Sequence, residues 1–457
     1  MRMSGADIMN ATGGSWHGAT PEVITAIATD TRDFKTGQVF LALRGPNFDG
    51  HTFAAPVADR ALALIGDREG VSLWSGIDTS KLEVDDTLQA LGDIAHAWRM
   101  RLEHTTVIAI TGSYGKTSLR TILETGFAAL GLNVSATRAN LNNLIGVPQT
   151  LLAVPEDAEI AVIECGISET GEMARLAAMV QPDIAILTGM TAAHAEGLGG
   201  LAGVVREKAL LLEHLSGNGW SGLGEGVADL LRANHISLPE QALTLDADEE
   251  KDSVSWQLVG RELLMRWREE EASMALALPA AHWAANIAFA ASIILRYLNG
   301  RDRKAGLTEV VAAISSWQPP AGRMQQCEGL NGCLVLDDCY NANPVSMQAA
   351  IDTLRALDGG RIAILGDMGE LGEGSEKAHG SIDIQGLDRV YLIGKRMQAL
   401  AARYPEVRWF ASTDEAVAGL SDESFEAGDT VLVKASRSMA LESIVRLLCR
   451  EEMAHAL

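Results

Sequence analysis

The chain has 457 residues, 47% of them hydrophobic and 21% charged, which predicts about three globular domains and excludes a fibrous or disordered protein. Lys and Arg number 37 against 60 Asp and Glu, and the formal net charge of −23 argues against a nucleic-acid or anionic-membrane binder. Phosphorylated ligands remain compatible with this charge, because local cations, a metal ion or helix N-termini hold them.

Cysteines and apolar segments bear on the compartment. The five cysteines fall at irregular spacings without a CxxC pair, so we expect neither a zinc ribbon nor a disulfide framework. The N-terminal segment MRMSGADIMN lacks an apolar signal core, and we expect a cytosolic chain. Residues 272–295 contain no Asp, Glu, Lys or Arg, but Pro279, His282, Asn286 and many alanines favour a buried helix over a membrane span.

Residues 1–103 form the first predicted domain. Short apolar runs at 39–43 and 61–65 are followed or preceded by turn sequences such as Arg44-Gly45-Pro46. A helical pattern over 88–102 closes the region.

Residues 104–316 form the second predicted domain. Continuous apolar strands at 105–111, 159–165 and 183–188 are separated by helical segments. This alternation predicts a parallel sheet covered on both faces, as in phosphate-loop ATPases. Residues 216–272 show weak patterns, and we predict no firm element there.

Residues 317–457, which begin at a Trp-Gln-Pro-Pro linker, form the third predicted domain. Its apolar strands alternate with helices and lie at 333–338, 361–367, 389–394 and 430–436. The pattern predicts a second, smaller doubly wound unit of the Rossmann type. The fold class is therefore α/β, with three domains.

The sharpest local motif is Thr111–Thr117, TGSYGKT, directly after a strand and at the start of a helix. Small residues let backbone N–H groups surround phosphate oxygens, while Lys116 suits the β- and γ-phosphates and the Thr117 hydroxyl suits Mg²⁺. The full GxxxxGK[ST] pattern requires glycine where this chain has Ile110, so an ordinary glycine turn is the alternative. The strand–turn–helix context favours phosphate binding.

Three further residues of the central domain are candidates for metal chemistry. Glu164 ends the second strand, where doubly wound sheets bind ligands, and a solvated strand-end acid is the competing interpretation. His194 follows the third strand and Lys208 lies in the next predicted helix. Each of these two alone is typical of a structural side chain, and only their combined spacing indicates a site.

Polar residues also gather after the strands of the third domain. Residues 337–344, DDCYNANP, suit a site that faces a domain cleft, and Arg323 follows the linker, where it could reach a phosphate. Lys434 and Arg437 follow the last strand and offer two cations to an anionic group. Ordinary surface loops are the alternative for each of these segments.

With these motifs in chain order, the sequence resembles the Mur ligases, the ATP-dependent amide-forming enzymes of peptidoglycan synthesis. The family's phosphate loop is a short TGxxGKT that lacks the earlier glycine, which accounts for Ile110. The stretch 338–347, DCYNANPVSM, is most similar to the members that join D-alanyl-D-alanine to UDP-N-acetylmuramoyl-tripeptide. The sequence departs from the family pattern at Trp283 and Ala435. The other matching stretches are 29–51, 111–117, 140–148, 164–172, 193–197 and 366–379.

The resemblance implies a role for many residues. Lys116, His194 and Lys208 would be catalytic. Two Mg²⁺ sites are implied, one on Thr117 and Glu164 and a second on His194 near a carbamylated Lys208. ATP would be bound by Gly112, Ser113, Tyr114, Gly115, Lys116, Thr117, Ser118, His282, Asn286, Arg323 and Asp338. The first domain would bind the nucleotide sugar, and substrate residues across the chain would be Thr31, Arg32, Arg44, Asp49, His51, Asn140, Asn142, Asn143, Tyr340, Asn341, Asn343, Lys434, Ser436 and Arg437.

The resemblance further implies the reaction. The tripeptide carboxylate would attack the γ-phosphate of ATP, and the amine of D-alanyl-D-alanine would then attack the acyl phosphate. We expect a cytosolic monomer without nucleic-acid or membrane partners, acting in cell-wall synthesis and thus in cell shape and division. The alternatives are a related ligase with a different acid or amine substrate, including the folylpolyglutamate type, and a non-catalytic nucleotide-binding relative.

Overall fold

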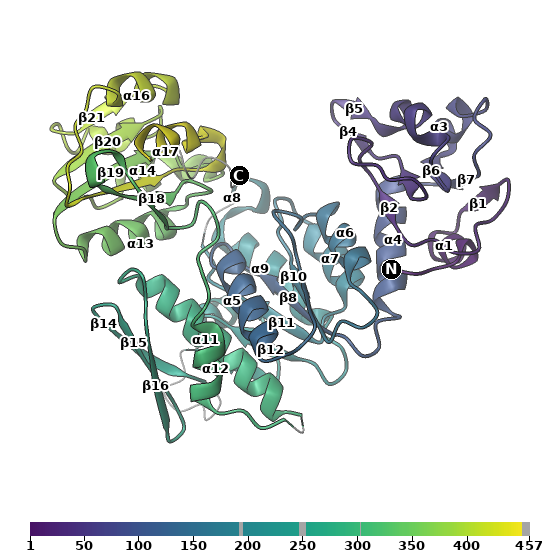
Figure 1. The fold of residues 1–457 in the computed structure, drawn as a ribbon, viewed down its shortest axis with the longest axis horizontal. Helices are drawn as coiled ribbons and strands as arrows, with labels where there is room; N and C mark the ends of the chain where they lie inside the picture. Colours follow the sequence, from purple (N-terminus) through teal and green to yellow (C-terminus); the bar gives the residue numbers. More distant parts are fainter. Residues whose placement is uncertain (192–194, 246–252, 302, 450–457) are drawn as a thin grey trace.

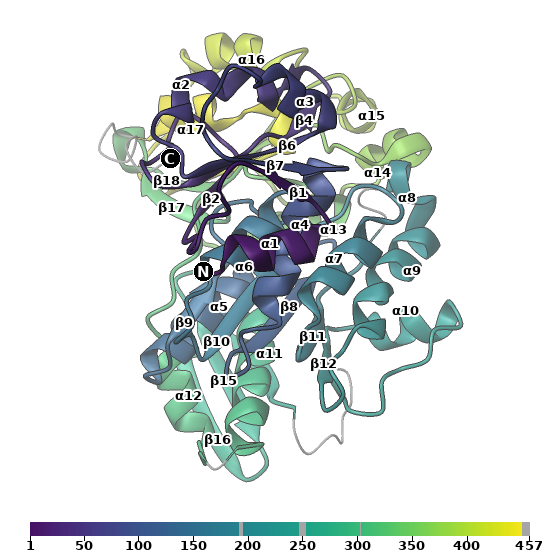
Figure 2. The ribbon, with the colours of Figure 1, turned by 90° about the vertical axis from the view of Figure 1, so that its right-hand side faces the viewer.

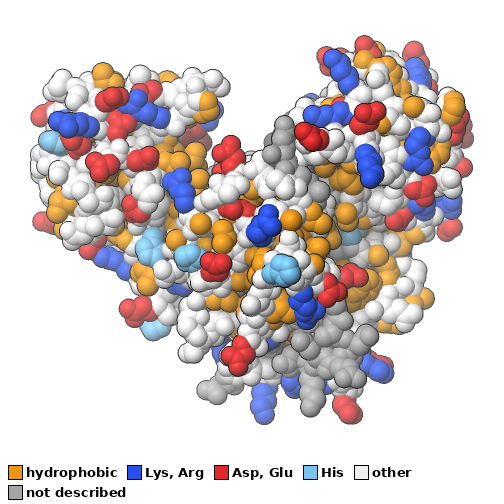
Figure 3. All heavy atoms as spheres, turned by 180° about the vertical axis from the view of Figure 1, so that it is seen from behind, with side chains coloured by type: hydrophobic (Ala, Val, Ile, Leu, Met, Phe, Trp, Pro, Cys, Tyr) orange, Lys and Arg blue, Asp and Glu red, His pale blue; other side chains and the backbone are white. Residues whose placement is uncertain are grey.

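The structure, a computed structural model, describes residues 1–191, 195–245, 253–301 and 303–449. An N-terminal and a C-terminal part stand on either side above a central part (Figure 1). Seen from behind, the surface is hollowed between these two outer parts (Figure 3). None of the helices among the described residues is long and apolar enough to cross a membrane.

The N-terminal part is built on a five-stranded sheet in the order β1-β7-β6-β3-β2, in which only the β1–β7 pair is antiparallel. Figures 1 and 2 both place this sheet above α1 and α4. A capping box of Ser4 and Asp7 starts α1, and left-handed Gly13 ends it. The elements are α1 (Gly5–Thr12), β1 (Ser15–His17), β2 (Ile27–Ala28), β3 (Val39–Leu41), β4 (Arg44–Gly45), β5 (Phe48–Asp49), η1 (Gly50–Phe53), α2 (Ala55–Ala58), β6 (Ala63–Asp67), α3 (Arg68–Leu73), β7 (Lys81–Val84) and α4 (Thr87–Arg99).

The central part contains a six-stranded, fully parallel sheet in the order β13-β12-β11-β8-β10-β9, as the continuous apolar runs predict. Alternate residues of β8 face opposite layers: Ile108 packs with α5 and α11, and Val107 with α4, α6, α7 and α9. The elements are β8 (Thr106–Thr111), α5 (Lys116–Ala129), β9 (Val134–Ala136), α6 (Gly146–Ala153), β10 (Ile160–Glu164), α7 (Glu172–Val180), β11 (Ile184–Leu187), α8 (Ala195–Leu198), α9 (Gly200–Glu213), β12 (Trp220–Leu223), α10 (Val227–Ala233) and β13 (Ala242–Thr244).

A small antiparallel sheet, in the order β14-β15-β16, extends the central part beside two helices. The expectation of a buried helix over 272–295 is wrong at its start, because Glu270–Ala275 is β16 and the helix begins only after Pro279. The remainder is a largely buried helix, as expected. The elements are β14 (Ser255–Val259), β15 (Glu262–Trp267), β16 (Glu270–Ala275), α11 (Ala281–Asn299) and α12 (Leu307–Ile314).

The C-terminal part has a six-stranded sheet in the order β17-β18-β22-β19-β20-β21, parallel except for β17. All four strands predicted there are present. The elements are β17 (Gln325–Glu328), η2 (Leu330–Gly332), β18 (Leu334–Asp338), α13 (Pro344–Arg355), β19 (Gly360–Gly366), η3 (Gly372–Gly374), α14 (Ser375–Gly380), β20 (Arg389–Ile393), α15 (Gln398–Ala401), β21 (Arg408–Phe410), α16 (Thr413–Leu420), β22 (Asp429–Lys434), η4 (Arg437–Met439) and α17 (Glu442–Leu448).

One cross-link was not predicted from the cysteine spacing, although there is no framework of several disulfides among the described residues. Cys327 and Cys449 form a disulfide, with their Cα atoms 6.2 Å apart and 122 positions apart in the sequence. It joins β17 to the end of α17, two elements that only the folded chain brings together. Cys165, Cys333 and Cys339 are free and buried.

Candidate active site

The loop between β8 and α5 has the geometry of a phosphate cradle. Gly115 caps α5 with a φ of 84°, and Gly112 has a φ of 153°. A Cβ at Gly112 would lie 1.9 Å from Thr188 Oγ1, so only glycine fits there. The backbone N–H of Ser113 donates to the carbonyl of Gly189 over 2.8 Å, which ties the loop to the end of the neighbouring strand β11.

Two lysines lie beside this loop, Lys116 half-buried and Lys208 fully buried. Lys116 Nζ donates to the carbonyl of Gly112 over 2.7 Å. Burial lowers the pKa of Lys116, while the charge of Glu164 acts against that change. Lys208, on α9, is 1% exposed, and burial followed by the positive charge of Lys116 holds its pKa well below the usual lysine value. Both effects act against the charged form of Lys208.

Thr117 and Glu164 face each other across the ends of α5 and β10. Thr117 Oγ1 donates to Glu164 Oε2 over 3.0 Å, and Glu164 is 3% exposed. Asn142 Nδ2 donates to Glu164 Oε1 over 3.0 Å, and Arg120 Nε lies 3.7 Å from Oε2. Hydroxyl and carboxylate oxygens are ligands that Mg²⁺ prefers. Among the described residues, no three His, Cys, Asp or Glu side chains come together as a metal site.

The C-terminal part reaches the loop through one guanidinium. Arg323 Nη2 donates to Thr117 Oγ1 over 3.0 Å, although the two residues are 206 positions apart. The Arg323 Cζ atom lies 4.5 Å from the ring centroid of Tyr340. The structure thus brings residues of two sequence regions into one polar cluster.

The predicted ATP residues on α11 lie beside the same loop. The position of a Cβ on Gly115 is 3.2 Å from Asn286 Oδ1, and Asn286 Nδ2 donates to the carbonyl of His282 over 2.9 Å. Burial lowers the pKa of His282 to about 4, against the raising effect of Asp338, and its Nδ1 is buried without a hydrogen-bond partner. Trp283, a departure from the family pattern, packs edge-on to Trp317 with ring centroids 5.6 Å apart. The indole of Trp283 therefore packs against the first residue of the linker, Trp317.

Predicted substrate residues of the C-terminal part make internal contacts. Lys434 Nζ donates to Asp338 Oδ2 over 2.6 Å and to the carbonyl of Asn341 over 3.0 Å. Ser436 Oγ donates to the carbonyl of Asp367 over 2.7 Å, and Arg437 forms an ion pair with Glu442. Asn343 caps α13. Lys434 and Arg437 are each paired with a carboxylate, so an anionic ligand would compete with that carboxylate at each.

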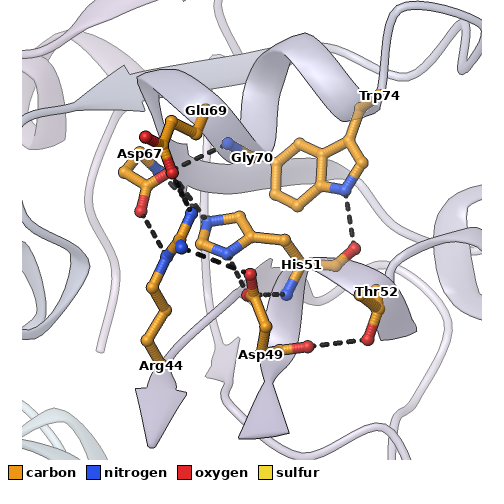
Figure 4. Close-up of polar contacts among 8 residues, drawn as sticks. All are labelled: Arg44, Asp49, His51, Thr52, Asp67, Glu69, Gly70 and Trp74. Carbon is orange, nitrogen blue, oxygen red and sulfur yellow. Dashed lines mark hydrogen bonds and ion pairs between the residues drawn. The ribbon is translucent and has the colours of Figure 1, made fainter.

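Three of the predicted substrate residues of the N-terminal part, Arg44, Asp49 and His51, belong to one polar network around His51 (Figure 4). Its Nδ1 lies 2.6 Å from Asp49 Oδ1, and its Nε2 accepts from the backbone N–H of Asp67 over 3.2 Å, so the proton lies on Nδ1. Arg44 donates to Asp67 over 2.8 Å and also pairs with Asp49 and Glu69. Burial acts to raise the pKa of Asp49, but hydrogen bonds from His51 and the Arg44 charge lower it.

His51 itself is buried, with no exposed side-chain surface. A Cβ on Gly70 would lie 1.7 Å from His51 Cδ2, and Trp74 Nε1 donates to the His51 carbonyl over 2.9 Å. His51 therefore holds the loop that presents Arg44 rather than presenting its own ring to solvent.

The remaining predicted substrate residues occupy two neighbouring segments. Exposed Arg32 pairs with Asp30, next to Thr31. Gln149 Nε2, on α6, donates to Thr29 Oγ1 over 2.6 Å and so links this segment to the one that contains Asn140, Asn142 and Asn143. Asn143 Oδ1 accepts from the N–H of Gly146 at the start of α6. Tyr114 and Ser118 lie on the loop and α5, and His194 lies outside the described residues.

Two residues near the loop are absent from the predictions. Arg120 is 6% exposed and follows Lys116 by four positions, one helical turn later on the same face of α5. Thr188 follows directly after β11, and its hydroxyl donates to the carbonyl of Tyr114 over 2.5 Å. Both signals are in the sequence: helical spacing from Lys116 and the carboxyl end of a parallel strand.

Two family models match the central and C-terminal parts of the chain. The family model described as the Mur ligase middle domain matches residues 110–294, and that of the Mur ligase, glutamate ligase domain matches residues 322–437. The chain belongs to the Mur ligase family. The UDP-N-acetylmuramoyl-tripeptide–D-alanyl-D-alanine ligase of Escherichia coli (strain K12) is 33% identical over 436 residues, which cover 93% of this chain and 94% of that relative.

Solved Mur ligase structures have the same fold over nearly the whole length. A crystal structure of MurF from Acinetobacter baumannii has a TM-score of 0.85 at 27% identity and covers 98% of this chain and 99% of that one. MurF from Thermotoga maritima in complex with ADP has a TM-score of 0.76 at 26% identity and covers 92% and 96%. The predicted α/β class with three domains is confirmed.

Proposed function

We propose that this chain is an ATP-dependent ligase that joins the carboxylate of UDP-N-acetylmuramoyl-tripeptide to the amine of D-alanyl-D-alanine in peptidoglycan precursor synthesis. The observation that carries the proposal is the relative of that name, which is 33% identical over 93% of this chain. The intact phosphate loop at Gly112–Thr117 supports a catalytic member of the family over a non-catalytic one.

ATP is the co-substrate in this proposal, and the ADP complex of the Thermotoga maritima MurF supports it. Loop N–H groups and Lys116 would hold its phosphates, with Arg323 meeting them from the C-terminal side. A carboxylate oxygen of the tripeptide attacks the γ-phosphorus, and ADP leaves with the electrons of the broken P–O bond. The amine of D-alanyl-D-alanine then attacks the carbonyl carbon of the acyl phosphate, releasing inorganic phosphate and one proton.

Mg²⁺ fits the residues on the ATP side. Thr117 and Glu164 supply a hydroxyl and a buried carboxylate 3.0 Å apart, the hard oxygen donors that this ion takes. Bound Mg²⁺ supplies positive charge for the transferring phosphoryl oxygens. We also propose a second Mg²⁺ near His194, with Lys208 as a carbamate. The low pKa of buried Lys208 supports this, because only a neutral amine reacts with CO₂.

The proposal extends to the substrate side and to the assembly. The network around His51 and the asparagines before α6 would receive the nucleotide sugar, and the loop after β18 would receive the peptide end.

We propose domain boundaries at 103/104 and 316/317, which keep each main sheet within one domain. We also propose a monomer that acts in the cytoplasm.

Phosphate release tests the function. The protein is incubated with ATP, Mg²⁺ and UDP-N-acetylmuramoyl-tripeptide, with and without D-alanyl-D-alanine, and products are identified by mass. Release that needs both substrates and yields the pentapeptide mass is expected. ATP binding without release would contradict this substrate pair and favour a Mur-type ligase for another acid or amine.

A further inference from the structure

Tyr340 lies between two guanidinium groups at the edge of the site. It follows β18, and its ring centroid is 4.5 Å from Cζ of Arg323 and 5.8 Å from Cζ of Arg437. Both distances are within the range in which a cation is attracted to the negative face of an aromatic ring. The shorter one belongs to the arginine that reaches the phosphate loop.

The backbone around Tyr340 is fixed from both sides. Its N–H donates to the carbonyl of Gly322 over 3.1 Å, and Gly322 has a left-handed φ of 68°. A Cβ on Gly322 would lie 3.0 Å from the Tyr340 Cβ, so the two segments pack closely. On the other side, Lys434 binds the carbonyl of Asn341 over 3.0 Å. The ring is therefore a fixed surface beside Arg323.

Arg323 differs from Arg437 in its electrostatic partners. Arg437 pairs with Glu442, whereas Arg323 forms no ion pair with any carboxylate of the described residues. It contacts the Tyr340 ring and donates to Thr117 Oγ1 over 3.0 Å. A carboxylate would hold a guanidinium in place but cancel its charge, whereas an aromatic face holds it and leaves the charge available to an anion.

We propose that Tyr340 is a positioning residue that holds the Arg323 guanidinium, with its charge uncancelled, where the terminal phosphate of ATP binds. This inference rests on the proposed ATP-dependent function. It assigns Tyr340 to the phosphate side of the site through Arg323, instead of to direct contact with the peptide substrate. When ATP enters, Arg323 exchanges Thr117 Oγ1 for a phosphate oxygen, and the ring remains its support.

A double-mutant cycle on nucleotide binding tests the inference. The Kd values of ADP and of the β,γ-imido analogue of ATP are measured with Mg²⁺ for the wild type, Tyr340→Leu, Arg323→Gln and the double variant. Tyr340→Leu is expected to weaken the analogue about tenfold relative to ADP, and Tyr340→Phe to stay within about twofold of wild type, because phenylalanine keeps the π face. In the Arg323→Gln background, Tyr340→Leu is expected to have no further effect.

If the fold-changes in Kd of the two single variants multiplied in the double variant, Tyr340 would act independently of Arg323, and the inference would be overturned. An equal loss for ADP and the analogue would also overturn it. Tyr404→Leu is the matched control, since Tyr404 stacks on Arg403 at 5.3 Å elsewhere in the same domain and should leave both Kd values unchanged. Tyr340→Met, of similar volume to leucine, replaces Tyr340→Leu if the latter does not fold by circular dichroism.

The assay separates this inference from the proposed function. It uses no peptide substrate, so a wild type that binds nucleotides as described but forms no pentapeptide would overturn the substrate assignment alone. If the wild type makes the pentapeptide but Tyr340→Leu keeps the wild-type ratio of Kd values for ADP and the analogue, only the positioning role is overturned.

Discussion

At the scale of single residues, the site depends on charged groups held in buried positions. Lys208 is buried and Lys116 is half-buried, and the positive charge of Lys116 helps to lower the pKa of Lys208 because like charges repel. In the proposed function, phosphate oxygens of ATP would meet Lys116 and favour the charged form of its amine. The proposed function gives Lys208 no phosphate to bind. The negative charge at this position would instead be that of the carbamate formed on Lys208 itself.

Replacing Lys208 tests that assignment. Lys208→Ala is expected to lower the ligation rate by about 100-fold, because a carbamate that orients a metal would be lost. A short-chain carboxylate such as acetate is expected to restore part of the rate, since it can occupy the vacated volume with the same charge. Rates are measured with and without acetate, and exposed Lys304→Ala is the control. A variant as active as wild type would contradict any role of Lys208 in metal positioning.

His282 makes stability depend on pH in a definite direction. Burial lowers its pKa to about 4 from an ordinary value of 6.5, so below pH 6.5 the unfolded chain binds a proton that the folded chain does not. The free energy of unfolding should therefore fall as pH decreases from 6.5 toward 4, by about 2 kcal/mol at pH 5 from this group. His282→Gln should remove that part of the change between urea titrations at pH 7 and pH 5.

Exposed His104→Gln is the control for His282, because it also removes one imidazole but at the protein surface. If His282→Gln lost as much stability between pH 7 and pH 5 as the wild type, burial of the imidazole would not be the cause of acid sensitivity.

At the scale of elements, the loop from β8 to α5 depends on a glycine whose place is set by a neighbouring strand. Gly112→Ala would put a Cβ 1.9 Å from Thr188 Oγ1, and either the loop or the segment after β11 must move. We expect the KM for ATP to rise about tenfold or more, at a stability cost of about 1–3 kcal/mol. Gly76→Ala is the control, because nothing lies within 4 Å of its Cβ position. An unchanged KM for Gly112→Ala would contradict the cradle geometry.

The elements that the sequence predicts well are those whose pattern has one physical cause. The strand Thr106–Thr111 is buried on both faces, so its run of apolar residues has no polar interruptions. The antiparallel strand β15 was missed although Leu263, Met265 and Trp267 alternate with exposed residues, because its neighbours β14 and β16 carry few buried residues. The helix α11 was placed too early, since alanine suits both the end of β16 and a helix.

At the scale of the whole molecule, cores and site both cross the predicted boundaries. One continuous cluster of buried residues joins the N-terminal part to one face of the central sheet, and another joins the opposite face to the C-terminal sheet. The contact between Arg323 and Thr117 spans 206 positions. Motifs and family resemblance supplied candidate site residues, but they did not predict that Lys434 pairs with Asp338 or that His51 is buried, because such features depend on packing between distant segments.

The disulfide gives a prediction for the C-terminal part. Because Cys327 and Cys449 close a loop of 122 positions, reduction is expected to lower the free energy of unfolding by about 2–4 kcal/mol through the entropy of the unfolded chain. Urea unfolding is followed with and without a thiol reductant, and Cys449→Ser should not respond to the reductant. Superimposable curves for oxidised and reduced wild type would contradict a stabilising cross-link.

The most direct test of ligation through an acyl phosphate follows one oxygen atom. UDP-N-acetylmuramoyl-tripeptide labelled with ¹⁸O in its terminal carboxylate is incubated with ATP, Mg²⁺ and D-alanyl-D-alanine, and the released phosphate is analysed by mass. Because the attacking carboxylate oxygen remains on phosphorus when the amine displaces it, one ¹⁸O atom per molecule is expected in the phosphate. Unlabelled phosphate formed together with the pentapeptide would contradict this account.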